Sequence, residues 1–161
     1  KWIGSKVAEQ HEGTVNISQG YLDIENGTLV GGQITIDMNT IKTTDMSEKY
    51  NLKLDKHLKN EDFFDVNEFD VATITIVQAW RGIGNEYKVL ANLTIKGITH
   101  PISFGADVNI DGLSYLAAAK IKIDRTKWDI KYNSGNFFKD LGDKLILDDI
   151  DIEIILVSKK Q

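Results

Sequence analysis

The chain has 161 residues, 42% of them hydrophobic and 27% charged, with a formal net charge of −5. These values fit one folded domain over residues 1–161 and exclude a disordered chain, while the acidic balance argues against nucleic acid as a partner. The sequence contains no cysteine, so it predicts no disulfide, no thiolate metal site and no cysteine nucleophile. It also has no run of the roughly 18 apolar residues that a membrane helix needs, so it predicts no membrane-spanning helix.

The first predicted elements are strands in the N-terminal quarter of the chain. Apolar and polar residues alternate weakly around residues 15–17 and 22–24, and clearly over residues 33–38. A period of two is typical of a strand with one buried face, because successive side chains point to opposite faces of a sheet. Asn26-Gly27 lies between the second and third segments, and this dipeptide is a strong signal for a hairpin turn.

A helix of about three turns is predicted over residues 46–59. Apolar residues recur there at steps of four, as on one face of a helix: Met46, Tyr50, Leu54 and Leu58. Asp45 with Glu48 three residues later has the spacing of a capping box, and Lys59-Asn60 suits the last carbonyls of the helix. Phe63 and Phe64 follow, and because they are too bulky and apolar for an open loop, we expect them to plug one end of the core or to line a cavity mouth.

The rest of the chain carries the clearest alternation, in segments at residues 71–80, 87–95, 102–110, 113–123 and 146–156. Turn residues separate several of them, at Gly82–Asn85 and at Asp111-Gly112. With the earlier segments this makes about eight strands, joined mostly by short connections. Such one-sided strands form either a sandwich or a barrel, and sequential hairpins favour an antiparallel up-and-down barrel. An eight-stranded barrel is either filled by side chains or holds one small ligand.

No motif in the sequence predicts a catalytic or metal-binding residue. His11, His57 and His100 fall in different predicted elements, and nothing in the pattern brings them together. Residues 107–112 match the first half of a calcium loop, but position 12 of that loop is Ala118 rather than glutamate, so we predict a hairpin turn. The acidic residues after Asp148 lie on the polar side of a strand and are predicted to face solvent: Asp149, Asp151 and Glu153.

Arg81 and Arg125 are the only arginines in the sequence. Arg125 ends an alternating segment, where a guanidinium at a barrel rim could receive an anionic or quinone head group through its planar fork of donors. The alternative is a salt bridge to a nearby aspartate such as Asp124 or Asp129. The residues alone leave both roles open.

The segment from His57 to Val66, His-Leu-Lys-Asn-Glu-Asp-Phe-Phe-Asp-Val, closely resembles the signature of the YceI-like polyisoprenoid-binding family. Four further stretches resemble motifs of that family in the same order: residues 11–14, 32–38, 93–99 and 123–128. The resemblance extends over nearly the whole chain, except at the extreme N-terminus, where we expect the first strand of the family to be clipped.

The resemblance implies a lipocalin-like antiparallel barrel whose interior holds a long isoprenoid, such as a polyprenyl quinone or polyprenyl phosphate. It implies a non-enzymatic carrier without a cofactor other than the bound lipid, and a periplasmic or other extracytoplasmic location after removal of a signal peptide. The expected partner is thus a polyisoprenoid or another long apolar lipid. A homodimer is left open.

The inward side of the predicted strands nominates the residues that line the tunnel: Met38, Ile74, Ile76, Leu93, Phe104, Tyr115, Ala117 and Ile121. Leu54, Leu58, Phe63 and Phe64 are expected to frame the entrance, with Arg125 as the head-group donor. Two other hypotheses stay open. One is a packed barrel without ligand that acts through its surface, and the other is an enzyme that acts on a small apolar substrate with an Asp or His inside the barrel.

Overall fold

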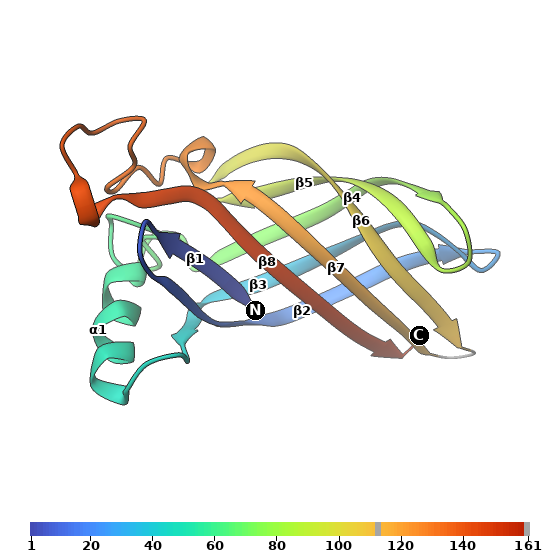
Figure 1. Ribbon diagram of the computed structural model, residues 1–161. Helices are drawn as coiled ribbons and strands as arrows, with labels where there is room; N and C mark the ends of the chain where they lie inside the picture. Colours follow the sequence, from blue (N-terminus) through green and yellow to red (C-terminus); the bar gives the residue numbers. More distant parts are fainter. Residues whose placement is uncertain (112–113, 160–161) are drawn as a thin grey trace.

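The computed structural model describes residues 1–111 and 114–159, and within these residues eight antiparallel strands form a closed barrel in chain order (Figure 1). The strands are β1 (Trp2–Lys6), β2 (Gln10–Glu25), β3 (Thr28–Thr43), β4 (Val71–Arg81), β5 (Glu86–Ile95), β6 (Ile98–Asp111), β7 (Ser114–Asp124) and β8 (Ile146–Lys159). The helix α1 (Glu48–Lys59) lies at one end of the barrel, and two 3₁₀ helices, η1 (Arg125–Trp128) and η2 (Gly142–Lys144), lie between β7 and β8.

The predicted up-and-down barrel with one helix is confirmed, and its later strands follow the predicted alternation. In β5, the inward side chains of Tyr87, Val89, Ala91, Leu93 and Ile95 are between 0 and 6% exposed. The turn at Asn26-Gly27 is also confirmed, since both residues have a positive φ, as a type I′ hairpin turn requires. Gly112 and Leu113, which belong to the predicted turn and to the predicted segment 113–123, lie outside the described residues.

The first two strands differ from the prediction. The segments at 15–17 and 22–24 belong to one long strand, β2, whose register with β3 shifts between Thr14 and Asn16 and again between Ile17 and Gln19. Such irregularities interrupt the alternation and move the apolar residues from odd to even positions. The sequence pattern of this one strand therefore looks like that of two short strands. The strand that the prediction lacks is β1. In the structure it pairs with β2 and with β8 and so closes the barrel.

The helix α1 begins at Glu48, two residues later than predicted, and ends at Lys59 as predicted. Its N-cap is Ser47 rather than Asp45, whose carboxylate is instead 2.9 Å from Nδ1 of His11. The predicted apolar stripe is wrong at Tyr50, which is 58% exposed.

One of the side chains that anchor α1 to the barrel is polar. The buried Asp55 carboxylate accepts hydrogen bonds from the backbone N–H and the hydroxyl of Thr43 on β3, both at 2.6 Å. A paired carboxylate can be buried at this place because both of these donors reach it. Amphipathic spacing alone gives no sign of such a contact.

Two tyrosines tie together the end of the barrel that lies away from α1. The backbone N–H of Leu22 donates to the hydroxyl of Tyr115, and that of Leu29 donates to the hydroxyl of Tyr87, at 3.0 and 3.3 Å. Both tyrosines are less than 8% exposed. They link β7 and β5 to the β2–β3 hairpin and close that end with side chains whose polar groups are satisfied.

Near α1, the wall of the barrel is completed by η1. The pairing of β6 with β7 covers residues 106–111 and 114–119, and the two strands separate toward the α1 end (Figure 1). Trp128 of η1 is buried there; it lies edge-on to His100 of β6 and donates from its indole N–H to the Leu93 carbonyl at 3.1 Å. This 3₁₀ helix therefore seals the part of the wall where the β6–β7 ladder ends.

Candidate functional site

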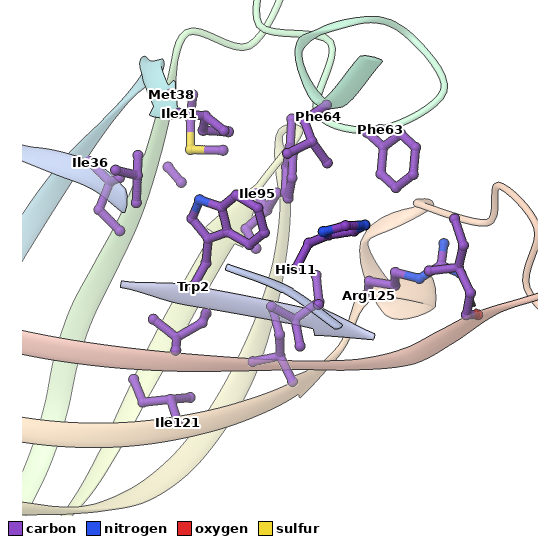
Figure 2. Close-up of a pocket in the computed structure, with 18 of the residues that line it drawn as sticks. Trp2, His11, Ile36, Met38, Ile41, Phe63, Phe64, Ile95, Ile121 and Arg125 are labelled. Atoms are coloured by element: carbon purple, nitrogen blue, oxygen red, sulfur yellow. Dashed lines mark hydrogen bonds between the residues drawn. The ribbon is translucent and has the colours of Figure 1, made fainter. Parts of the chain in front are cut away.

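An apolar cavity of about 160 Å³ lies inside the barrel at the α1 end (Figure 2). A single water needs only about 10–15 Å³ measured in the same way, so this space is large for a protein interior. It reaches the surface beside Leu147, which is 44% exposed. In the described part of the chain, nine isoleucines line it: Ile36, Ile41, Ile74, Ile95, Ile121, Ile123, Ile146, Ile150 and Ile152.

A second, deeper cavity of about 40 Å³ lies toward the closed end of the barrel. Ile74 belongs to the wall of both cavities, so the two spaces are neighbours along the barrel. The deeper one is lined by apolar side chains such as Ile76, Phe104 and Ala117. The interior is thus hollow over part of its length, and its walls offer contacts for a hydrocarbon chain.

The structure places most of the predicted tunnel residues around these two cavities. The predicted residues that line the main cavity are Met38, Leu54, Leu58, Phe63, Phe64, Ile74, Leu93, Ile121 and Arg125. Ile76, Phe104 and Ala117 line the deeper cavity, whereas Tyr115 lies at the closed end, where its hydroxyl holds β2. The prediction missed Trp2 and His11, because β1 and the start of β2 showed no alternation, and it missed wall residues such as Ile95 and Ile150, although they share the inward parity.

Phe63 and Phe64 both line the main cavity, and Phe63 is buried, at 6% exposed. The Phe63 ring lies 5.0 Å from the His57 ring of α1 and 5.4 Å from the Tyr132 ring, between ring centroids. His57 and Tyr132 also meet edge-on at 4.7 Å. Aromatic contacts of this kind join α1, the segment after it and the segment after η1 into one rim.

Arg125 is 1% exposed, and its guanidinium is directed at backbone carbonyls. It donates to the carbonyl oxygens of Ile130, Ile146 and Leu147 at 2.8, 3.0 and 3.1 Å, and it lies 3.4 Å from the Asp148 carboxylate. Burial lowers the pKa of Arg125, and the charge of Asp148 opposes this shift. The side chain therefore holds the two ends of the loop over residues 130–146 together through hydrogen bonds to their carbonyl groups.

The salt bridge of Arg125 thus involves Asp148 rather than the two aspartates named from the sequence. Asp124 accepts hydrogen bonds from the backbone N–H and the hydroxyl of Thr126 and so caps η1. Asp129 pairs with Lys131 at 2.6 Å. Both of these predicted partners are therefore corrected, because the chain turns sharply at η1 and directs their carboxylates elsewhere.

His11 lies in the cavity wall between Trp2 and Arg125 in the view of Figure 2. Its Nδ1 is 2.9 Å from Oδ2 of Asp45, and its Nε2 is 3.8 Å from Oε2 of Glu9. Burial alone would raise the pKa of Asp45, but hydrogen bonds from His11 and from the backbone N–H groups of Glu12 and Asp45 outweigh it and lower that pKa. The ionised carboxylate then orients the imidazole.

The three histidines stay apart, each with its own partner. His57 lies 3.1 Å from Asp62, and His100 lies 2.9 Å from the Lys127 carbonyl. Within residues 1–111 and 114–159, no group of three or more His, Cys, Asp and Glu residues has the arrangement of a metal site. In the same part of the chain, no helix combines the length and the apolar character needed to cross a membrane.

The acidic residues of β8 face solvent, as predicted, and pair across the outer surface with lysines of β7. Lys122 lies 3.1 Å from Asp151 and 3.9 Å from Asp149, and Lys120 lies 3.6 Å from Glu153. Asp107 and Asp111 lie on β6, and Asp111 pairs with Ser114 of β7. These carboxylates lie outside the cavity.

A comparison with protein families finds a YceI-like domain over residues 3–157. A UPF0312 protein of Photorhabdus laumondii is 28% identical over 121 residues, which cover 75% of this chain and 62% of that protein. A UPF0312 protein of Staphylococcus aureus is 35% identical over 92 residues, which cover 57% of this chain and 46% of that protein. The chain thus spans about half of the length of such curated relatives.

Solved structures share the same barrel. BcnA of Burkholderia cenocepacia superimposes with a TM-score of 0.73 and 19% identity, over 98% of this chain and 93% of that one. A polyisoprenoid binding domain from Saccharophagus degradans, described as implicated in plant cell wall breakdown, superimposes with a TM-score of 0.68 and 14% identity, over 99% and 92%. At these identities the likeness is one of fold.

Proposed function

The chain belongs to the YceI-like family, and from this premise we propose that it is a non-catalytic carrier that holds a long isoprenoid lipid inside its barrel. The observation that carries the proposal is the main cavity, whose wall combines isoleucines with Trp2, Phe63 and Phe64 and reaches the surface at the α1 end. A hydrocarbon tail inside such a wall leaves water without any need for polar partners.

The energetics of tail burial support this role. Each buried CH₂ contributes about 0.8 kcal/mol, so one isoprene unit contributes roughly 3–4 kcal/mol. Association costs about 4–15 kcal/mol in lost freedom of motion, which two or three buried units largely offset. A few more units then give micromolar or tighter binding. The deeper cavity offers space for a tail that extends past Ile74.

The polar groups of the wall favour binding over catalysis. A nucleophile activated by His11 would have to lie within hydrogen-bond distance of its Nε2. Among the described residues, the group that faces this atom is the Glu9 carboxylate, 3.8 Å away. Arg125 is occupied by three carbonyls and Asp148. These groups are engaged in holding the rim of the barrel.

The proposal includes a transport or sequestering role in an extracytoplasmic compartment, which the family resemblance supports. A cell fractionation that recovers the protein with cytoplasmic markers would contradict this location. It would leave lipid binding itself untouched, because the cavity does not depend on the compartment.

The binding proposal is tested by titration of the purified protein with geranylgeraniol, a C20 isoprenoid alcohol, followed by tryptophan fluorescence. Trp2 lines the cavity, whereas Trp80 is 44% exposed on the outside and Trp128 is a buried residue of η1. We expect a saturable change at one ligand per chain that disappears in Trp2→Phe while binding measured by co-sedimentation or extraction persists. A linear response without saturation in the wild type would refute the proposal.

A further inference from the structure

Helix α1 carries a positively charged surface on an acidic protein. The whole chain has a formal net charge of −5, but α1 contains four lysines and two acidic residues, and one of the two, Asp55, is buried against β3. Lys49, Lys53 and Lys56 are exposed. With 3.6 residues per turn, these three lysines lie within about 60° of one another around the helix axis. Leu58, which lines the main cavity, is on the opposite side of the helix.

In the described part of the chain, no ion pair neutralises this lysine stripe. The lysines that form ion pairs there are Lys1, Lys6, Lys120, Lys122 and Lys131. The stripe also brings the helix little stability of its own. Like charges at i and i+4, such as Lys49 and Lys53, repel each other, and a cation in the first turn, such as Lys49, faces the positive end of the helix dipole. The stripe therefore suits an anionic partner outside the chain.

Exposed apolar side chains lie beside the lysines and in the neighbouring loop. Leu52 is 62% exposed and precedes Lys53 and Lys56 on the outer side of α1. Phe137 and Phe138, in the loop over residues 130–146, are 51% and 50% exposed. Two adjacent exposed phenylalanines leave much apolar surface in water. Lysines interspersed with leucine and phenylalanine are typical of surfaces that lie in the head-group region of a membrane.

These features share one end of the barrel with the opening of the main cavity. Helix α1 and the loop over residues 130–146 both lie at this end (Figure 1). They meet where the His57 ring packs edge-on against the Tyr132 ring, 4.7 Å between centroids. The main cavity reaches the surface at the same end beside Leu147, which follows the loop directly. A partner that covers the lysine stripe and the two phenylalanines would therefore lie over the opening.

We propose that the α1 end of the barrel docks on the surface of an anionic phospholipid membrane. The lysine stripe contacts the lipid phosphates, and Phe137 and Phe138 enter the head-group region. An apolar tail then passes between the bilayer and the cavity with little exposure to water. Docking is a property of the outer surface and needs no lipid in the cavity, so it can fail while the proposed carrier function holds.

The first test is co-sedimentation of the purified protein with vesicles that contain no isoprenoid. Vesicles of equal parts phosphatidylglycerol and phosphatidylcholine should bind the protein at least about tenfold more tightly than vesicles of phosphatidylcholine alone. This preference should shrink between about 0.1 M and about 1 M salt, because the screening length falls from about 10 Å to about 3 Å. Equal binding to the two kinds of vesicle would overturn the proposal. Binding to neither would exclude the membrane as the partner of this surface.

A pair of lysine substitutions tests the role of α1. A lysine near an anionic leaflet contributes about fivefold to the affinity, so Lys53→Gln combined with Lys56→Gln should weaken binding to anionic vesicles about 10- to 30-fold. The matched control is Lys120→Gln combined with Lys122→Gln, which changes the net charge equally on the outer face of β7. The control should lose little affinity. An equal loss in the two double variants would show that net charge decides binding, and it would overturn the proposal.

A pair of phenylalanine substitutions tests the insertion of the loop. Phe137→Ser combined with Phe138→Ser keeps every charge and should weaken vesicle binding about 3- to 10-fold. Ile155→Ser combined with Val157→Ser is the control, because these side chains are 70% and 74% exposed on β8; an equal loss there would overturn the assignment of the loop. Titration with geranylgeraniol in solution separates the two proposals. Saturable uptake without vesicle binding would overturn docking alone, and vesicle binding without uptake would support docking and overturn the carrier function.

Discussion

Tryptophans placed at two depths of the barrel should measure how far the lipid tail reaches. Ala72 is 3% exposed in the wall of the main cavity, and Ala117 lines the deeper cavity. An indole at either place occupies the volume of at least one isoprene unit. Loss of one buried unit, at roughly 3–4 kcal/mol, weakens binding about 10²- to 10³-fold. Ala72→Trp should therefore impair binding of short and long isoprenoids alike.

Ala117→Trp should impair only ligands whose tails are long enough to pass Ile74. The assay is a titration of both variants with C10, C15, C20 and longer isoprenoid alcohols, with Leu116→Trp as control. Leu116 is 47% exposed on the outer face of the same strand, so the same side chain there should change nothing. Because overpacking a core costs about 1–3 kcal/mol, urea denaturation must show that the variants stay folded. Unchanged affinity in a folded Ala72→Trp variant would refute the placement of the ligand.

Three single substitutions test the contacts that frame the cavity. Arg125→Lys removes the guanidinium that donates to the Ile130, Ile146 and Leu147 carbonyls. The free energy of unfolding, measured in urea, should therefore fall by about 2–4 kcal/mol. Arg81→Lys is the control, because it affects only one exposed hydrogen bond to the Gly84 carbonyl, and an equal loss in both variants would contradict the role of Arg125 in holding the loop over residues 130–146. Asp55→Ala leaves two buried donors of Thr43 without an acceptor and should cost about 1–3 kcal/mol, with loss of amide protection in α1; full protection of α1 in this variant would show that other contacts hold the helix. The pKa of Asp45 is lowered in the folded state, so its charge stabilises the fold above the unfolded pKa of about 3.9, and this contribution disappears as the pH falls through the folded value. The stability difference between wild type and Asp45→Asn should therefore shrink between about pH 6 and pH 2, and a constant difference would argue against the His11–Asp45 pair.

Much of the barrel could be predicted because its later strands are regular. In β5, each inward residue is apolar and each turn uses residues that suit a hairpin, so local pattern and final structure agree. The start of the chain was harder to interpret. β1 is a five-residue strand without alternation, and β2 contains irregularities that move its apolar residues from one face to the other.

In the candidate site too, some residues could be predicted from the sequence and others could not. Wall residues such as Leu93 and Ile121 follow from strand parity, because in a barrel one face of every strand must point inward. The roles of the polar residues depend on contacts between segments that are distant in sequence, such as Asp45 with His11 and Arg125 with Ile146. Periodicity carries no information about these contacts, so the place of Arg125 at the rim could be predicted but its partners could not.

The most direct test of lipid carriage is extraction of the purified protein with organic solvent, followed by mass spectrometry of the extract. The account predicts a polyprenyl lipid near one molecule per chain. If the expression host lacks the lipid, the empty protein should take up added isoprenoid to the same stoichiometry. An empty extract from a protein that also takes up no added isoprenoid would contradict the account.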